Sequence, residues 1–182
     1  MFDKIDLTKF WDEDDYYKKS CTGEILTDEM LIATEKELGY RLPDSYKEFM
    51  KIRNGGKPVK DFFVSEKDRY CVQLGMFFSI SEDKQNSIFG EFSNEFWYEI
   101  WRYPRDIGVI IADTISAGHE MIYLDYRECG KSGEPKVCIC LQESDFETIH
   151  LANNFDEFVN NLKSEEEIDV IKNKNLQIFT FI

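Results

Sequence analysis

Histidine is scarce in this sequence, and the motifs that build metal centres and nucleotide sites are missing. Only two of the 182 residues are histidines, His119 and His150, and they lie in different predicted elements. There is no His-x-x-x-His pair, no Cys-x-x-Cys pair and no calcium-binding loop of alternating aspartates. The glycines form no dinucleotide-binding or phosphate-binding loop. We therefore expect no bound metal and no cofactor.

Long hydrophobic runs are absent as well. The longest, residues 107–112, is far too short to cross a bilayer. The N-terminus has neither the basic start nor the apolar stretch of a secretion signal. The five cysteines are odd in number and scattered, which is typical of reduced thiols. They are Cys21, Cys71, Cys129, Cys138 and Cys140. These observations predict a cytoplasmic location, no membrane contact and no disulfide that folding requires.

Lysine and arginine are few relative to the acids. The chain has 22 Lys and Arg against 36 Asp and Glu, which gives a formal net charge of -14. Nucleic acid and anionic membrane surfaces repel such a chain, so neither is an expected partner. A basic protein is attracted instead, although acidity also serves solubility alone. Charge therefore narrows the class of partner and says nothing about the fold.

Hydrophobic residues, by contrast, are abundant. Apolar residues make up 42% of the chain and aromatic residues 15%, which is enough for a folded core. No repeat, low-complexity tract or linker rich in Pro, Gly or Ser divides the sequence. We therefore expect a single domain over residues 1–182.

Two helices are predicted over residues 27–38 and 43–53. Thr27 is a favourable N-cap for the first helix, acids fill its first turn, and a glycine follows its last turn. Pro43 suits the start of the second helix. An Asn-Gly-Gly run, which tolerates positive φ, ends that helix.

After residue 56 the pattern changes to short β-branched or aromatic runs, which predict strands. The runs are residues 61–65, 70–80, 108–113, 121–126, 136–141 and 147–152. Helical patterns occupy residues 93–103 and 153–163, a helix or loop follows over residues 164–175, and residues 176–182 form a possible edge strand. The fold class is α+β, with N-terminal helices, an antiparallel sheet of about five to six strands, and a C-terminal helix packed on the sheet.

His119 is the first residue to consider for catalysis. It has a possible nucleophile partner in Cys129, or in Cys138 or Cys140 on a neighbouring strand. Any sheet protein with five cysteines supplies such a pair, so we favour a turn histidine with structural hydrogen bonds. The two thiols on one strand are more often small buried groups than redox or metal ligands.

Carboxylates give no clearer catalytic centre. Asp113, Glu120 and Asp125 flank the predicted sheet, but 32% of all residues are charged, so chance proximity is expected. A glycosidase-type pair needs a defined separation that no sequence provides. We therefore expect no catalytic residues and a protein that is not an enzyme.

Aromatic residues surround an acidic run near the N-terminus. Phe10 and Trp11 precede the run, and Tyr16 and Tyr17 follow it. Two interpretations are open: an interaction patch, or a helix that lies on the core with a solvated acidic face. The second is the simpler.

The two-helix stretch, "LTDEMLIATEKELGYRLPDSYKEFMKIRNGG", resembles the opening signature of the SUKH superfamily, a group of cell-wall-assembly-regulator-like proteins and their bacterial relatives. The matching residues are Leu31, Glu35, Leu38, Gly39, Leu42, Pro43, Tyr46, Phe49, Met50, Asn54, Gly55 and Gly56. One departure is Thr34, where an apolar residue is usual.

Two further stretches carry the same resemblance. Gly118, His119 and Asp125 match a turn that leads into a strand ending in Asp, and Phe155 and Phe158 match the last helix of the family. The resemblance covers about residues 8–162. It is closer still to a bacterial branch of immunity proteins, and the tail after residue 163 lies outside it.

The resemblance implies a fold and a function. Gly118 and His119 form a turn into a central strand, and the family has no known shared catalytic residues. Its bacterial members resemble immunity proteins that bind and neutralise secreted toxins, often nucleases. A nuclease is basic around its phosphate-binding groove, so an acidic inhibitor associates quickly and competes with the substrate. The implied partner is therefore a cognate, basic toxin domain.

Two other classes of function stay open. One is an intracellular regulatory scaffold that binds a host protein with the same fold, and the other is an enzyme centred on the residues considered above. For the immunity interpretation we choose Asp12, Glu13, Asp14 and Asp15 as part of the contact, because they cluster beside aromatic residues.

Overall fold

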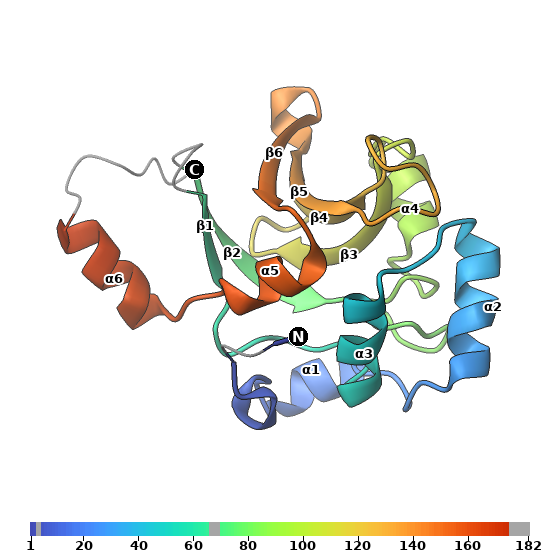
Figure 1. The fold of residues 1–182 in the computed structure, drawn as a ribbon, viewed down its shortest axis with the longest axis horizontal. Coiled ribbons are helices and arrows are strands. Elements are labelled where there is room, and N and C mark those ends of the chain that lie inside the picture. Colours follow the sequence, from blue (N-terminus) through green and yellow to red (C-terminus); the bar gives the residue numbers. More distant parts are fainter. Residues whose placement is uncertain (3–4, 66–69, 175–182) are drawn as a thin grey trace.

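The structure is a computed structural model that describes residues 1–2, 5–65 and 70–174 (Figure 1). The possible edge strand over residues 176–182 lies outside the described residues. Within the described part, helices accompany a six-stranded antiparallel sheet, so the predicted α+β class is confirmed.

The strands pair in chain order from β1 to β6. They are β1 (Phe62–Ser65), β2 (Tyr70–Phe77), β3 (Gly108–Thr114), β4 (Glu120–Asp125), β5 (Lys136–Leu141) and β6 (Glu147–Ala152). The helices are α1 (Asp15–Ser20), α2 (Asp28–Leu38), α3 (Asp44–Ile52), α4 (Asn94–Glu99), α5 (Phe155–Asn160) and α6 (Glu165–Lys174). Short 3-10 turns occupy η1 (Leu7–Lys9) and η2 (Gln142–Ser144).

Three elements are distinctly shorter than their sequence patterns. The helix predicted over residues 153–163 occupies only Phe155–Asn160, because Asn154 caps its start and the chain leaves helical geometry at Asn161. The strand predicted over residues 70–80 ends at residue 77, because the peptide of Ile80 is bound by an asparagine side chain instead of a neighbouring strand. The helix predicted over residues 93–103 ends at residue 99, and Arg102 adopts a positive φ of 65° that no helix allows.

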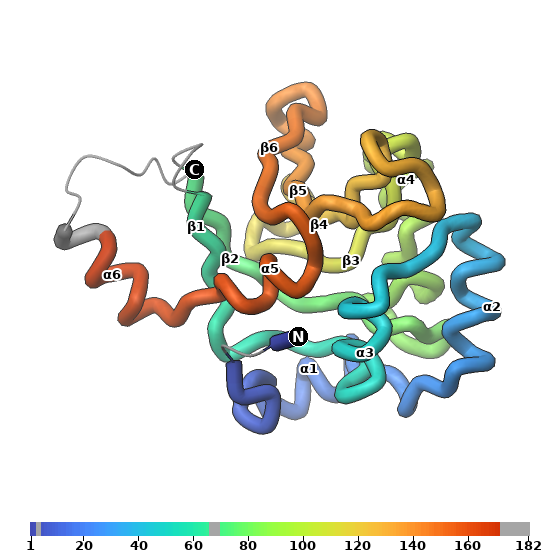
Figure 2. The backbone as a smooth tube through the Cα atoms, in the orientation of Figure 1, coloured from blue at the N-terminus to red at the C-terminus, as the bar shows by residue number. Residues whose placement is uncertain are grey.

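The sheet curls until its two outer strands approach each other, as the tube in Figure 2 shows. Phe62 of β1 and Lys163, just after α5, exchange two backbone hydrogen bonds of 3.1 and 2.8 Å. Helix α5 contacts β5 and β6 on one side and α3 on the other. The predicted C-terminal helix on the sheet is thus confirmed, and it joins the sheet to the N-terminal helices.

Helices α2 and α3 begin and end where the sequence indicates. The Thr27 side chain accepts a hydrogen bond from the backbone N–H of Met30, and Gly39 closes α2 at φ 71°. Thr34 is buried although it is polar, because its hydroxyl donates to the carbonyl of Met30 at 2.9 Å. A Thr therefore fits the place of an apolar residue.

Aromatic rings fill the space between α3, α5 and the sheet. The Phe49 ring of α3 lies 5.3 Å from both Phe77 and Phe155, measured between ring centroids. Tyr46 packs edge-on against Phe155 at 5.0 Å, and Phe158 stacks on the Phe63 ring. These rings are almost fully buried, so the signature residues of the two-helix stretch and of the last helix build one shared core.

Asn54, two residues after the end of α3, does more than end a helix. Its amide nitrogen donates to the carbonyls of Glu24 and Ile80 at 2.9 and 3.0 Å, and its amide oxygen accepts from the N–H of Ile80 at 2.7 Å. Gly55 has a φ of 85°, and a Cβ there would lie 2.3 Å from the carbonyl oxygen of Cys21. Three chain segments therefore meet at this Asn-Gly pair.

The predicted glycine turn between β3 and β4 is confirmed. Gly118 has a φ of 100°, and a Cβ there would lie 2.9 Å from the Trp97 ring. The Gly118 carbonyl accepts a hydrogen bond of 2.8 Å from the Tyr103 hydroxyl. Both the backbone conformation and the ring above it exclude larger residues at this position.

Replacing Gly118 by Val should lower the free energy of unfolding by roughly 1–3 kcal/mol, because a branched side chain is strained at this φ and meets Trp97. Gly130 is the matched control, since it also has a positive φ but open space around it. Gly130→Ala should therefore cost less, about 1 kcal/mol. Chemical denaturation of both variants measures the difference, and a neutral Gly118→Val would contradict this account of the turn.

Two buried tyrosines should respond differently to loss of the hydroxyl. The Tyr46 hydroxyl has no hydrogen-bond partner among the described residues, so Tyr46→Phe should keep or raise stability. Tyr103→Phe should lose about 1–3 kcal/mol, since it leaves the Gly118 carbonyl without its donor. Thermal and denaturant unfolding of the pair tests this. A greater loss for Tyr46→Phe than for Tyr103→Phe would refute it.

Candidate protein-binding surface

His119 does not face a cysteine nucleophile. Its ring nitrogen Nδ1 lies 3.1 Å from the side-chain oxygen of Gln142, and its ring packs against Trp101 at 5.6 Å. Burial raises the pKa of the Cys140 thiol to about 12 and the pKa of Cys138 well above its ordinary value. Both thiols are therefore protonated near neutral pH, whereas a catalytic nucleophile has to be a thiolate.

The three carboxylates that flank the sheet serve separate purposes. Asp113 accepts the N–H of Met76 at 2.7 Å where β2 and β3 shift register, and burial raises its pKa to about 7. Glu120 begins β4 and Asp125 ends it, so these two lie at opposite ends of one strand. The arrangement brings no two of them together as an acid–base pair.

Asp125 has a local partner instead. Its carboxylate accepts hydrogen bonds from the backbone and the guanidinium of Arg127, the shortest at 2.6 Å. Burial opposes ionisation, but these bonds prevail and lower the pKa of Asp125. The signature aspartate therefore fixes the chain where it leaves the strand.

Part of the acidic N-terminal run is engaged in ion pairs and capping. Glu13 pairs with Arg53 at 2.7 Å and with Lys18 at 2.8 Å, and Asp14 caps α1 through the N–H of Tyr16. Phe10 and Trp11 are buried in the aromatic core, whereas Tyr16 is 59% exposed. The run thus has a structural role, and its role in partner contact stays a prediction.

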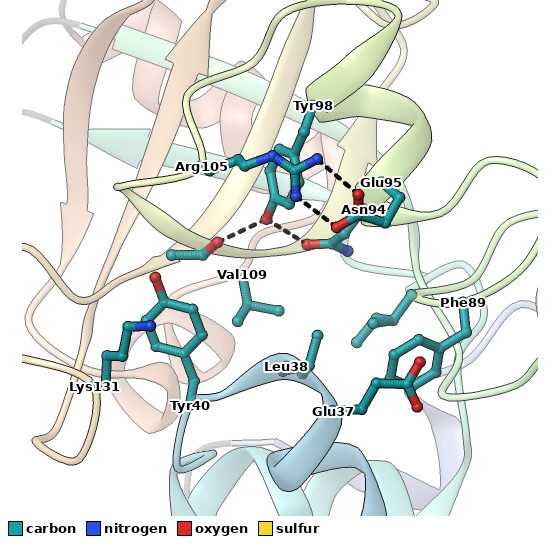
Figure 3. A pocket seen from close by; sticks show the side chains of 12 residues that line it. Glu37, Leu38, Tyr40, Phe89, Asn94, Glu95, Tyr98, Arg105, Val109 and Lys131 are labelled. Atoms are coloured by element: carbon teal, nitrogen blue, oxygen red, sulfur yellow. Dashed lines mark hydrogen bonds and ion pairs between the residues drawn. The ribbon is translucent and has the colours of Figure 1, made fainter.

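Two adjoining cavities form a groove along α2. The first has a volume of about 280 Å³ and lies between the end of α2, helix α4 and the start of β3 (Figure 3). The second, of about 320 Å³, lies between α2 and residues 80–83. Glu37 and Phe89 line both cavities, so the two adjoin each other. We call them together the α2 groove.

Aromatic side chains and two basic side chains, each in contact with a tyrosine ring, line the first cavity. Arg105 bonds both oxygens of Glu95 at 2.6 and 2.7 Å, which lowers the pKa of that carboxyl, and it lies over the Tyr98 ring. Lys131 lies 5.1 Å from the centre of the Tyr40 ring. In Figure 3 these side chains surround an opening that Glu37 and Phe89 face from the opposite side.

Buried hydrogen bonds hold the base of this cavity. The Asn94 side chain donates to the carbonyl of Ile110 at 2.9 Å and accepts its N–H at 2.7 Å. The Tyr98 hydroxyl lies 2.7 Å from both the Asn94 side-chain oxygen and the Gly108 carbonyl. Helix α4 is therefore fixed on β3, and the cavity wall has a defined position.

The second cavity is acidic and apolar. Its lining includes no Lys or Arg; the residues are Glu24, Met30, Ala33, Thr34, Glu37, Ile80, Ser81, Glu82, Asp83 and Phe89. The four acids are exposed, and Lys84 pairs with one of them, Asp83, at 3.5 Å. Carboxylates around apolar side chains suit a basic and partly apolar segment of another protein.

Sequence reasoning missed this groove. Its walls come from three stretches, residues 24–40, 80–89 and 94–109, together with Lys131. Each stretch alone has an ordinary mixture of acids and aromatics. A usable signal was the excess of Glu on the exposed side of α2, beside the aromatic-rich residues 89–98.

The described residues give no sign of a metal centre or a membrane span. No three His, Cys, Asp or Glu side chains among residues 1–2, 5–65 and 70–174 are grouped as metal ligands. Over the same residues, no helix has the length and apolarity needed to cross a bilayer.

Thiol chemistry should separate the cysteines by burial. In the native protein Cys129 should react with a thiol reagent such as DTNB well before Cys138 and Cys140, because those two are buried with raised pKa values. Reductant should leave the melting temperature unchanged. Fast native reaction at Cys138 or Cys140, located by mass spectrometry, would restore the nucleophile hypothesis.

Comparison with known families gives a match over most of the chain. Residues 25–161, from the start of α2 past the end of α5, match the SMI1 / KNR4 family (SUKH-1). No curated protein matches the chain. The matched region spans more than half of the 182 residues and includes both helices of the opening signature, the glycine turn and α5. The chain therefore belongs to the SMI1 / KNR4 family (SUKH-1) of the SUKH superfamily.

Proposed function

We propose that this chain is a non-enzymatic, cytoplasmic immunity protein, which binds the toxic domain of a cognate secreted effector and blocks it by occlusion. Membership of the SUKH superfamily carries the proposal, since it supports a protein-binding role in immunity or regulation. The net charge of -14 supports a basic partner, because an acidic protein attracts a basic one.

The α2 groove is the contact surface that we favour for this function. Its second cavity combines four carboxylates with the exposed edge of the core at Met30 and Phe89. A toxin that degrades nucleic acid has Lys and Arg around its substrate groove. Side chains of that kind enter an acidic hollow favourably, and their engagement leaves no room for the nucleic acid substrate.

The acidic run Asp12, Glu13, Asp14 and Asp15 is a second proposed part of the contact. Asp15 is exposed in the first turn of α1, and the ion pair of Glu13 with Lys18 is on the surface, where such pairs are worth little. A partner's arginine exchanges with Lys18 at small cost, whereas the Arg53 side chain is only 14% exposed and stays in place. The run therefore contributes to long-range attraction more than to tight packing.

Co-expression is the direct test of function. Cells that produce the toxin domain of the neighbouring gene should survive with this chain and die without it. Equal death in both cultures would refute immunity. A complex with a host regulatory protein, formed without any toxin, would instead favour the intracellular regulatory scaffold.

Charge removal in the groove should slow association. Glu37→Gln combined with Glu82→Gln should reduce the association rate by about tenfold at low salt, because two exposed carboxylates leave the contact. The matched control is Glu165→Gln with Glu166→Gln, which removes the same charge from the first turn of α6. Stopped-flow or surface-plasmon kinetics at several salt concentrations measures both.

Two results would contradict the groove as the contact. One is an equal effect of the groove and control pairs, which would show that net charge alone matters. The other is an effect only when residues 12–15 are neutralised, which would place the contact on the N-terminal run. Melting temperatures should stay unchanged for both pairs, since all four side chains are exposed.

A further inference from the structure

The loops beside α4 and at one end of the sheet concentrate strained backbone. Within the described residues, five residues other than glycine have positive φ, and four of them are Arg102, Ala117, Asp145 and Phe146. Conformations of this kind persist only where the surrounding structure enforces them, and they cluster at ligand-binding sites. The strained backbone therefore makes this end of the molecule a candidate binding surface.

The three loops that contain these residues meet around one tyrosine. The Tyr103 hydroxyl donates to the carbonyl of Gly118, and its ring lies 5.5 Å from Phe146. The backbone N–H of Gln142 donates to the carbonyl of His119 at 2.9 Å. We call residues 100–103, 115–119 and 142–147 together the loop end. Its loops are held to one another, so its surface is preorganised.

The loop end exposes apolar side chains next to a hollow. Ile100 is 67% exposed and Ile115 is 65% exposed, and the Trp101 ring is partly exposed over His119. A hollow of about 230 Å³ begins at Ser116, the residue after Ile115. Ile115 precedes Ser116 of the hollow, and Ile100 precedes Trp101, whose ring packs on His119 of the same hollow. Apolar side chains that are exposed around a concave surface favour a protein contact.

Charge at the loop end selects a basic partner. Glu120 and Glu143 line the hollow, whose lining includes no Lys or Arg, and Asp145 and Glu147 are exposed on the same turn. Arg102 is the single Lys or Arg among the residues of the loop end, so the net charge of this surface is negative. A second copy of this chain would bring the same acids face to face, which charge repulsion disfavours.

We propose that the loop end is a second docking surface, which binds a segment of a partner protein with adjacent aliphatic side chains flanked by Lys or Arg. It is separate from the α2 groove, because no residue lines both hollows. Helix α4 divides them: Asn94 and Tyr98 face the groove, whereas the Trp97 and Trp101 rings lie over Gly118. The proposal does not depend on the partner being a toxin.

Peptide titration of the full chain, labelled with ¹⁵N, tests the proposal. The probe is the peptide Lys-Lys-Ile-Ile-Lys-Lys, and two control peptides replace its isoleucines by serine or its lysines by glutamate. The probe should shift amide signals of the loop end. Both control peptides should bind about tenfold more weakly, because one loses the apolar contact and the other loses the charge attraction.

Matched variants locate the binding. Ile100→Ser with Ile115→Ser should weaken binding of the probe about tenfold. Ile32→Ser with Ile52→Ser should leave the affinity unchanged, although those two isoleucines are similarly exposed. Glu143→Gln with Glu147→Gln should weaken the probe at low salt and gives a second readout if the first pair fails to fold. Shifts in the α2 groove instead, equal binding of the serine control, or no shift at any concentration would each overturn the proposal.

Discussion

The buried amide of Asn54 is the interaction on which the arrangement of helices and sheet depends. It binds both the N–H and the carbonyl of Ile80 and also the carbonyl of Glu24, so a single side chain holds the chain before α2, the end of α3 and the chain after β2. The bonds to Ile80 are buried, and an unpaired buried group costs about 1–3 kcal/mol. The glycines that follow allow the close approach that the amide requires.

Asn94 makes the same pair of backbone hydrogen bonds at the start of α4. It binds the N–H and the carbonyl of Ile110, as Asn54 does for Ile80, and this fixes α4 at the point where β3 shifts register against β4. Because α4 is fixed, one of its faces closes the α2 groove and the other covers the glycine turn. Both candidate binding surfaces therefore take their shape from buried asparagine hydrogen bonds.

Local structure was predictable from the sequence because its causes are local. Thr27 and Gly39 bound α2 by capping, Gly118 marks a turn through its φ, and short β-branched or aromatic runs mark all six strands. The ends of β2 and α4 were not predictable, since Asn54 and the backbone of Arg102 decide them through tertiary contacts. The groove and the loop end were missed for the same reason. Their residues are ordinary in sequence and become a surface only when three distant segments meet.

The pairing of every strand with the next strand in the chain has a consequence for how the protein is made. Most strands close only a short connection to the strand before them, so the entropic cost of each pairing is small; the exception is β3, which follows β2 after residues 78–107 and helix α4. A chain that emerges from the ribosome adds β2 to β1, β3 to β2 and so on, without waiting for distant partners. The long-range bond from the Phe2 N–H to Asp156, at 2.6 Å, can form only once α5 has been synthesised. Synthesis of α5 is therefore the step at which the N-terminal segment gains its place and the ring core closes.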